Sequence, residues 1–504
     1  MAYISTNPYN GSVLQRFEEF SDAQLEQKLA AAQHTFATQW RLTSFDERRA
    51  VIARAATLMR ERAEPLARLI TLEMGKLIVQ SRGEVALSAA ILDYYAEHAQ
   101  TFLAPEVLRS AKGSATVESE PLGVLLGVEP WNYPYYQIAR FAAPNLMAGN
   151  VVMVKQAANV PQCALAFAQL MQDAGLPTGA YTNLFISKDQ VAQLIDDTRI
   201  RGVALTGSEA AGAVVAARAG KNLKKSTLEL GGSDAFIVLE DADIAQALKH
   251  AVAGRMGNAG QACTASKRFI VVEAVADAFL DKFQAALSAF TPGDPLDTAT
   301  KLAPLSSQAA LDTLLGQVSD AVAHGAKLLM GGQRIAGQAG AFMQPTVLTD
   351  IDPQNPAYRQ EFFGPVALFF RVPDEAAAVA LANDSPFGLG GSVFTRDIER
   401  GRRVARQIDT GMVFINSAAM SAAELPFGGV KNSGYGRELS AAGILEFVNR
   451  KLVHVVRSSS TEQASQAHRP RPVPAPGFAA AAPGRVPRQP RFASPRSAGG
   501  GGAS

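Results

Sequence analysis

The stretch RGVALTGSEAAGAVVAARAGKNLKKSTLELGG, residues 201–232, contains the alternation that decides the fold. It opens with a short apolar run, GVALT (202–206), and passes through a Gly-Ser turn into a helix predicted over 208–219. A second strand-like run then ends in two glycines. Continuous apolar runs of this length fit strands that are buried on both faces, as in parallel sheets. The stretch therefore predicts one βα unit of a parallel sheet.

The same alternation continues on both sides of this stretch. Helices predicted over 45–75 come first, and further strands alternate with helices after them: PLGVLLGV (121–128), VVMVK (151–155), YTNLFI (181–186) and AFIVL (235–239). A second series, with RFIVVE (268–273) and MVFIN (412–416), indicates another α/β domain. The predicted fold class is α/β, with an open, doubly wound parallel sheet and a second α/β domain.

The composition indicates a large globular protein. The chain has 504 residues, 47% of them hydrophobic, which is enough for two or three domains. Its two cysteines cannot form a disulfide framework, and its six histidines show no metal-ligand spacing, so no metal is expected. No apolar stretch approaches the ~18 residues of a bilayer span, and residues 1–11 are polar. We therefore expect a cytoplasmic protein without a membrane partner.

The last 48 residues differ in composition from the rest. Residues 457–504 are rich in Pro, Gly, Ala and Arg and show no structural period, which predicts a disordered tail. Seven arginines and one glutamate give this tail a net charge of +6 and leave −4 on residues 1–456. Because the basic residues have almost no aromatic neighbours, no nucleic-acid partner is expected. A Pro-rich ligand for a partner domain is the alternative interpretation.

A candidate phosphate site follows the strand 202–206. The chain has no GxGxxG, the usual dinucleotide-binding fingerprint. Instead Thr206-Gly207-Ser208, with Gly212 four residues later, opens the predicted helix where backbone N–H groups and the helix dipole can receive a phosphate. A simple helix N-cap at Ser208 is the alternative.

Cys263 is the candidate nucleophile. It stands in a loop of small residues, GNAGQACT (257–264), which leaves a thiol approachable, but a thiol reacts only where its pKa is lowered or a base is near. The other cysteine, Cys163, lies in an apolar helical segment and is interpreted as a small core residue.

Two polar residues in apolar surroundings are candidates for chemistry. Glu229 is one acid inside an apolar run, so it is either a base with a raised pKa or the partner of Lys224 or Lys225. Asn132, in PWNYP (130–134), is either an oxyanion donor or a turn residue.

Taken together, these motifs resemble those of the aldehyde dehydrogenase superfamily, in the family's order. They are PWNYP (130–134), Lys155 at a strand end, TGS (206–208), LELGG (228–232), GQAC (260–263), EFFGPV (361–366) and PFGG (426–429). The resemblance covers residues 5–456. The family has a variant Rossmann domain without the usual fingerprint, and within it the chain is most similar to bacterial NAD(P)-dependent succinate-semialdehyde dehydrogenases.

The resemblance implies a role for each catalytic candidate. Cys263 would attack the aldehyde, Asn132 with the Cys263 N–H would hold the oxyanion, and Glu229 would activate the water that hydrolyses the thioester. It also implies a set of residues that bind NADP or NAD: Trp131, Lys155, Ala158, Thr206, Gly207, Ser208, Gly212, Leu230, Gly231, Glu361 and Phe363.

One position bears on the choice of cofactor. NAD-preferring relatives often carry a glutamate three residues after the lysine, where it repels a 2′-phosphate, and this chain has Ala158 there. We therefore expect NADP to be accepted at least as well as NAD.

The resemblance also implies a substrate-binding set. Arg140, Ser421 and Tyr136 would bind the carboxylate end of succinate semialdehyde. A second arginine used by better-known members is replaced by Glu273, and tyrosines at 133, 135 and 136 leave an aromatic or other aliphatic aldehyde open.

The resemblance implies three domains and an oligomer. Residues 1–103 and 122–232 would bind NAD(P), residues 233–422 would form the catalytic domain, and residues 104–121 with 423–456 would form an oligomerisation arm. An exposed edge strand at 451–456 predicts a homodimer or homotetramer.

Two other functions remain open, and a third fits the sequence poorly. Transfer of the acyl group to coenzyme A is disfavoured by Glu229, which a deacylation by water needs. A cysteine hydrolase would need a histidine partner that nothing in the sequence marks. A non-catalytic binding protein is disfavoured because Cys263, Glu229 and Asn132 are all present.

Overall fold

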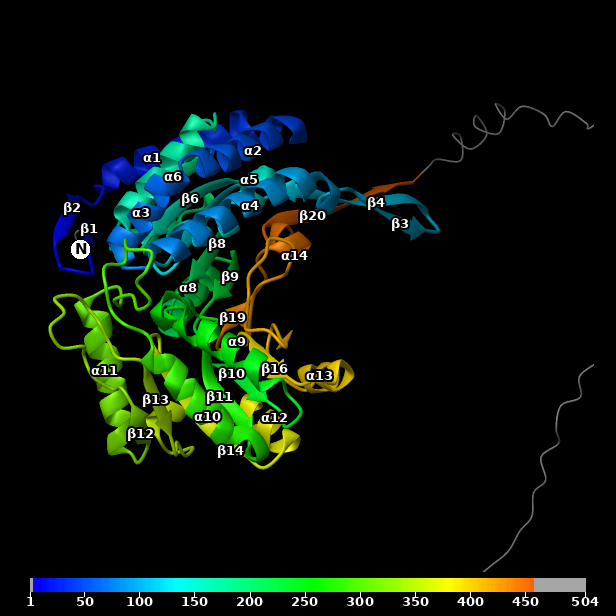
Figure 1. Ribbon diagram of the computed structural model, residues 1–504. Helices are drawn as coiled ribbons and strands as arrows, with labels where there is room; N and C mark the ends of the chain where they lie inside the picture. Colours follow the sequence, from blue (N-terminus) through cyan, green and yellow to red (C-terminus); the bar gives the residue numbers. More distant parts are fainter. Residues whose placement is uncertain (1–2, 457–504) are drawn as a thin grey trace, which may run out of the picture. The chain divides into compact units, whose positions relative to one another are not determined.

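The computed structural model describes residues 3–456 (Figure 1). Among the described residues, 3–109 and 115–453 belong to one compact unit, and 110–114 with 454–456 belong to a second. The predicted disorder of 457–504 lies outside the described residues. Among residues 3–456, no helix is both long and apolar enough to cross a membrane.

The first large sheet has six strands in the order β19-β9-β8-β5-β6-β7. Its strands are β5 (Val124–Glu129), β6 (Val151–Gln156), β7 (Tyr181–Asn183), β8 (Ile200–Thr206), β9 (Lys225–Glu229) and β19 (Gly434–Tyr435). All neighbours are parallel except β19, which is antiparallel to β9. Because β5 lies between β6 and β8, the winding reverses there, and the carboxyl ends of β5 and β8 flank the crevice in which such sheets bind ligands.

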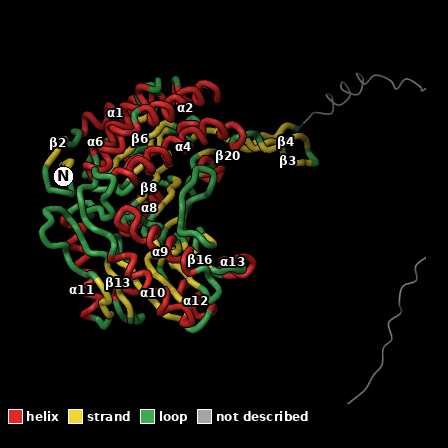
Figure 2. Tube along the Cα trace, viewed as in Figure 1, coloured by secondary structure: helices red, strands yellow, loops and turns green. Residues whose placement is uncertain are grey.

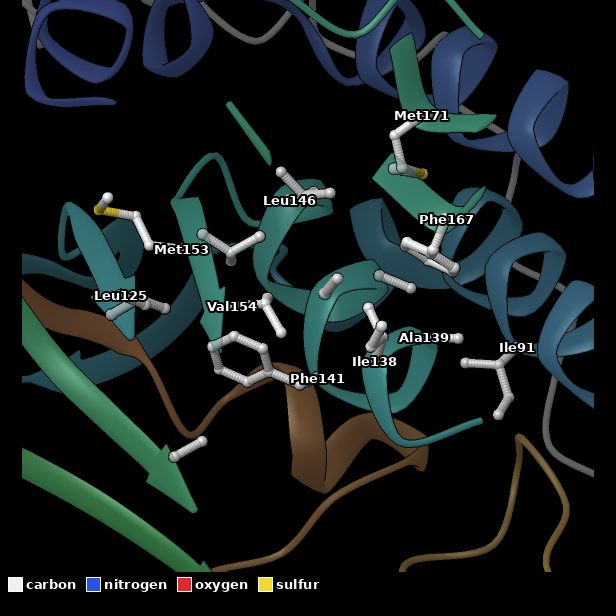
Figure 3. Close-up of a cluster of buried hydrophobic side chains, with 14 of the residues drawn as sticks. Ile91, Leu125, Ile138, Ala139, Phe141, Leu146, Met153, Val154, Phe167 and Met171 are labelled. Atoms are coloured by element: carbon white, nitrogen blue, oxygen red, sulfur yellow. The ribbon is translucent and has the colours of Figure 1, made fainter. Parts of the chain in front are cut away.

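Helices cover this sheet and fill the core around it (Figures 1 and 2). They are α1 (Asp22–Thr38), α2 (Phe45–Glu61), α3 (Ala63–Met74), α4 (Ile78–Phe102), α5 (Pro134–Met147), α6 (Pro161–Asp173), α7 (Lys188–Asp196) and α8 (Glu209–Lys221). Every residue of α5 is buried. Figure 3 shows Ile138, Phe141 and Leu146 of this helix beside Val154 of β6. The helix that follows Asn132 is therefore fixed on all sides by packing.

The second large sheet has seven strands in the order β12-β13-β14-β11-β10-β16-β17. They are β10 (Asp234–Val238), β11 (Ser266–Val272), β12 (Lys327–Met330), β13 (Thr346–Thr349), β14 (Val366–Val372), β16 (Gly391–Phe394) and β17 (Phe414–Ile415). Alternate residues enter different cores: Phe236 and Phe269 pack on one face, Ile237 and Ile270 on the other. Burial on both faces explains why these strands are continuous apolar runs.

Five helices accompany the second sheet, and the predicted α/β class is confirmed. They are α9 (Ile244–Met256), α10 (Glu273–Ser288), α11 (Gln308–Ala323), α12 (Glu375–Asn383) and α13 (Ile398–Ala405). The predicted strand 412–416 is shorter than expected, since only Phe414–Ile415 pair with β16.

Short elements complete the described chain. They are β1 (Tyr3–Thr6), β2 (Val13–Phe17), β3 (Glu106–Ser110), β4 (Gly113–Pro121), β15 (Phe387–Gly388), β18 (Val430–Lys431), α14 (Ser440–Ile444) and β20 (Val448–Val455). The strands β20, β4 and β3 form a three-stranded sheet. Residues 423–447 differ from the expected arm, because β19 joins the first large sheet and β18 pairs with β15. The division into three domains otherwise stays a prediction.

Candidate active site

A cavity of about 300 Å³ lies at the reversal point of the first sheet. Segments after β5, β8 and β9 meet there with the loop that precedes β11. Its lining brings together three catalytic candidates and eight cofactor candidates: Asn132, Glu229 and Cys263, with Trp131, Thr206, Gly207, Ser208, Leu230, Gly231, Glu361 and Phe363. Residues that are more than 200 positions apart in sequence thus face one space, as the predicted chemistry requires.

The loop that carries Cys263 has an unusual backbone. Asn258 and Ala259 have φ values of 52° and 51°, and Gly260 has a φ of 77°. A Cβ on Gly260 would lie 2.3 Å from the Gly364 carbonyl oxygen, so only glycine fits this turn. The strained turn fixes where the chain re-enters the cavity at Cys263.

The Cys263 thiol is half-buried at the cavity wall. Burial raises its pKa to about 12, although the positive charges of Arg140 and Lys267 oppose that rise. In these surroundings the sulfur is therefore a protonated thiol at neutral pH.

The Asn132 amide is oriented by two neighbours. Its Nδ2 donates to the Gln261 carbonyl oxygen at 3.1 Å, and its Oδ1 accepts from Gln137 Nε2 at 3.4 Å. Asn132 is only 4% exposed. The nitrogen end therefore faces the Cys263 loop, where an oxyanion donor has to lie, and a second amide hydrogen remains for a ligand.

Glu229 is the last residue of β9 and is 3% exposed. Within the described part of the chain, neither of its carboxylate oxygens has a hydrogen-bond partner. Lys224 instead donates to carbonyl oxygens, and Lys225 pairs with Glu446. The ion-pair interpretation of Glu229 is therefore wrong.

Burial raises the pKa of Glu229 well above its ordinary value. The nearby Glu438 carboxylate raises it further, and Arg140 opposes both effects. A carboxyl whose pKa is shifted upward in a cavity beside a thiol is suited to accept a proton near neutral pH.

Two contacts hold the Glu361 carboxylate at the cavity wall. Its Oε1 lies 2.9 Å from Lys267 Nζ and accepts from the Gly232 N–H at 3.1 Å. A Cβ on Gly231 would lie 2.5 Å from Glu361 Oε2, so this glycine leaves the space that the carboxylate uses. Lys267 also donates to the Cys263 carbonyl oxygen at 2.7 Å. One buried ammonium thus joins the cysteine loop to Glu361.

The turn after β8 has the geometry of a helix N-terminus. Ser208 caps α8, where its side chain accepts from the Ala211 N–H at 3.4 Å, so the N-cap interpretation is confirmed. A Cβ on Gly207 would meet nothing nearer than Leu205 Cδ2 at 3.5 Å. An anion can therefore approach the backbone here, and the residues present fit a dinucleotide.

Gly212 has a different role, because a Cβ there would lie 2.6 Å from a methyl carbon of Leu230, so this glycine allows close packing.

Lys155 and Ala158 lie beyond the cavity, at the carboxyl end of β6. Lys155 Nζ lies 5.6 Å from the centroid of the Tyr3 ring. Burial lowers the pKa of Lys155, repulsion from Lys188 lowers it further, and Glu19 opposes both. Ala158 packs on the small apolar cluster that contains Tyr3. The structure therefore places a second ammonium, Lys188, near the one predicted to contact the ribose.

The three substrate candidates form one connected chain. Arg140 Nη1 donates to the Tyr136 hydroxyl at 3.2 Å, and that hydroxyl donates to Ser421 Oγ at 3.0 Å. Arg140 is 1% exposed and forms an ion pair with Glu438. Burial works against the charge of Arg140, but attraction to Glu438 holds its pKa above the ordinary value. None of the three belongs to the described lining of the 300 Å³ cavity, so their role stays a prediction.

Sequence reasoning missed several residues that hold the site. Gln137, Lys267 and Glu438 contact Asn132, Cys263 and Arg140 respectively. Each is a buried polar side chain, and a polar residue in a mostly apolar helix was the available signal for Gln137. The contact of Glu438 with Arg140 joins distant parts of the sequence, so no local pattern could predict it. Gln137 and Lys267 lie within five positions of their partners, but the direction of their side chains depends on the tertiary structure.

Comparisons of the sequence with known proteins all point to one family. The aldehyde dehydrogenase family model matches residues 2–453. The chain is 52% identical to a succinate-semialdehyde dehydrogenase [NADP(+)] of Deinococcus radiodurans, over 90% of this chain and 94% of that protein. It is 45% identical to the succinate semialdehyde dehydrogenase [NAD(P)+] Sad of Escherichia coli, over 89% and 97%.

A solved structure agrees with these sequence matches. The crystal structure of succinic semialdehyde dehydrogenase from Streptococcus pyogenes in complex with NADP+ superposes with a TM-score of 0.89 at 46% identity, covering 90% of this chain and all of that one. The family model, which matches residues 2–453, spans both large sheets and the segments that line the cavity. The chain belongs to the aldehyde dehydrogenase family.

Proposed function

We propose that the protein oxidises succinate semialdehyde to succinate and passes the hydride to NADP, with NAD as an alternative acceptor. The observation that carries this proposal is the single cavity lined by Cys263, Asn132 and Glu229. The two curated relatives and the solved structure named above are succinate-semialdehyde dehydrogenases, which supports the choice of substrate.

The first step uses the thiol and the amide. Cys263 Sγ forms a bond to the aldehyde carbon, and its proton leaves to solvent as the sulfur attacks, because the thiol is protonated at rest. The negative charge that develops on the aldehyde oxygen is held by Asn132 Nδ2 and by the Cys263 N–H. A donor of this kind contributes about 3 kcal/mol to the transition state.

The cofactor would occupy the cavity between Ser208 and Cys263. The N-terminus of α8 would receive its phosphates, and Glu361 and Phe363 would hold the part nearest the thiol. When bound, a nicotinamide ring supplies an acceptor for the aldehyde hydrogen as hydride.

The second step uses Glu229. Its carboxylate accepts a proton from a water molecule that attacks the thioester carbon, and the carbon–sulfur bond breaks. The sulfur leaves as a thiolate and takes a proton from solvent, which restores the Cys263 thiol. The proton passes from Glu229 to solvent. This step distinguishes the proposal from acyl transfer to coenzyme A, for which a deacylating base has no use.

The chain Arg140–Tyr136–Ser421 supports a substrate with a carboxylate. A guanidinium and two hydroxyl groups are suited to bind a carboxylate beyond the aldehyde. Tyr135 does not widen this region for an aromatic substrate, because its ring stacks on Phe167 in the core. The ion pair with Glu438 means that Arg140 has to divide its charge between two carboxylates.

Two ammonium groups support NADP. Lys155 and Lys188 lie close enough for their charges to interact, and Ala158 adds no carboxylate. A 2′-phosphate beside both would relieve their mutual repulsion.

A substrate panel tests the proposed function. Succinate semialdehyde, propionaldehyde and benzaldehyde are each mixed with the protein and with NADP or NAD, and reduced nicotinamide is followed by absorbance. We expect the highest kcat/KM with succinate semialdehyde and NADP, and no signal from Cys263→Ala. A dependence on added coenzyme A, or a preference for benzaldehyde, would reject the proposal.

Self-association through the three-stranded sheet is part of the proposal. Val107 and Leu452 are 79% and 61% exposed on its strands, and an apolar strand of this kind is a pairing surface. Light scattering on the purified protein tests this: a monomer at micromolar concentration would contradict it.

A further inference from the structure

A buried ion pair lies directly behind Asn132. Lys76 is in the loop between α3 and α4, and Glu84 is in the second turn of α4. Their side chains are 1% and 0% exposed, and Lys76 Nζ contacts Glu84 Oε2. The chemical steps described above use neither residue.

Lys76 forms a hydrogen bond with the backbone of Asn132, the proposed oxyanion donor. Its Nζ donates to the Asn132 carbonyl oxygen at 2.8 Å and lies 3.5 Å from the centroid of the Tyr133 ring. The same carbonyl oxygen accepts from Asn258 Nδ2 at 3.0 Å, and Asn258 belongs to the strained turn before Cys263. The backbone of Asn132 is thus tied to the Cys263 loop.

Glu84 fixes the other side of Asn132. Its Oε1 accepts from the N–H groups of Tyr135 and Tyr136, at 2.9 Å and 3.3 Å. These groups belong to the first turn of α5, which has no side-chain N-cap of its own. A carboxylate at this end satisfies free N–H groups and favours the helix dipole. The ion pair therefore holds the residues on both sides of the Asn132 amide.

A contribution to the stability of the fold does not by itself explain why the Lys76–Glu84 ion pair is buried here. Burying two charges costs desolvation energy, and a buried ion pair is often no better for stability than apolar residues of the same volume. An oxyanion donor, in contrast, loses most of its effect when it moves by a fraction of an ångström. Fixing the position of Asn132 is what the contacts of this pair achieve.

We propose that Lys76 and Glu84 are positioning residues that hold the Asn132 amide in place for the oxyanion. The inference rests on the proposed function, in which Asn132 is the oxyanion donor. Neither residue touches substrate or cofactor, and both act through the backbone at 132–136.

A double-mutant cycle tests this inference. The variant Lys76→Met/Glu84→Gln removes both charges together, keeps side chains of similar length and leaves no unpaired charge. It is compared with wild type, with Asn132→Ala and with the triple variant, using succinate semialdehyde and NADP. We expect kcat to fall about 10- to 100-fold in the wild-type background, with KM for NADP within about twofold. In the Asn132→Ala background the same change should lower kcat by less than about twofold, because the donor is already gone.

A second buried carboxylate provides the matched control. Glu73 is fully buried in α3 and accepts from the N–H groups of Gln162 and Cys163 at the start of α6, at 3.0 Å and 2.9 Å. It has the same helix-capping role at α6 as Glu84 has at α5, and these bonds are to Gln162 and Cys163 instead of residues 132–136. Glu73→Gln should leave kcat within about twofold of wild type, whereas Glu84→Gln should lower it. Thermal melting and circular dichroism of every variant show that each remains folded.

The outcomes separate the inference from the function on which it rests. An equal loss of kcat in both backgrounds, or an equal effect of Glu73→Gln and Glu84→Gln, would overturn the positioning role while the oxyanion role stands. If Asn132→Ala keeps full kcat, the oxyanion assignment fails and the inference falls with it. A loss confined to the background that retains Asn132 supports both.

Discussion

Arg140 and Glu438 form an ion pair that is almost completely buried, next to the carboxyl of Glu229. One guanidinium therefore faces two carboxyl groups in a region of low dielectric constant. Burial raises the pKa of Glu438 as well as that of Glu229, and Arg140 opposes the rise in both. The charge state of Glu229, the proposed base, is thus linked to a residue that the sequence suggested only for substrate binding.

A comparison of two aldehydes, one with a carboxylate and one without, tests whether Arg140 binds the substrate carboxylate. Arg140→Met alone leaves Glu438 unpaired and should destabilise the protein by about 3–5 kcal/mol, whereas Arg140→Met/Glu438→Gln should recover most of that loss. If Arg140 binds the carboxylate, the double variant raises KM for succinate semialdehyde about 10- to 100-fold and leaves KM for propionaldehyde within about twofold. Steady-state kinetics with both aldehydes decide this, and parallel changes in both KM values would refute carboxylate binding.

Activity should rise with pH through the titration of Glu229. The base works only when deprotonated, and burial moves its pKa upward, so kcat should increase as pH rises on the acid side of the profile. Glu229→Gln should lower kcat about 10²- to 10⁴-fold and remove this limb, while a first-turnover burst of reduced nicotinamide persists. Stopped-flow absorbance measures the burst. Its loss would indicate that Glu229 is needed before the thioester forms.

The reactivity of Cys263 without cofactor should follow its thiolate fraction. Since burial raises the pKa to about 12, alkylation by iodoacetamide should become about tenfold faster for each pH unit between pH 7 and pH 10. Mass spectrometry of peptides gives the rate for each cysteine. The fully buried Cys163 serves as an internal control and should stay unmodified. A rate independent of pH over this range would contradict a resting thiol.

Lys188 should favour NADP over NAD. Its charge interacts with Lys155, so Lys188→Gln should raise KM for NADP several-fold and leave KM for NAD nearly unchanged. Lys221→Gln is a control of equal charge, because Lys221 is exposed in the last turn of α8. Initial rates with both cofactors measure the effect. Equal changes in the two KM values would place Lys188 away from the 2′-phosphate.

Local sequence features predicted the strands and the turn that carry the cofactor candidates. The apolar runs at 151–155, 202–206 and 235–239 became β6, β8 and β10 to within two residues, because burial on both faces leaves an uninterrupted apolar signal. The segment 423–447 was misplaced because β18 and β19 are two-residue strands, too short for any period.

The sequence by itself determined the fold class and the family, and it named Cys263, Glu229 and Asn132 as the catalytic candidates, since these follow from patterns and motifs within short stretches of chain. Only the tertiary structure determined which charged groups lie next to those residues. Among the described residues, no group forms a hydrogen bond with the Glu229 carboxylate. Arg140 forms an ion pair with Glu438, and Lys76 donates to the carbonyl oxygen of Asn132, which lies 56 positions later in the sequence. Such contacts join distant segments, and the charge balance at a buried site depends on what packing brings within a few ångströms.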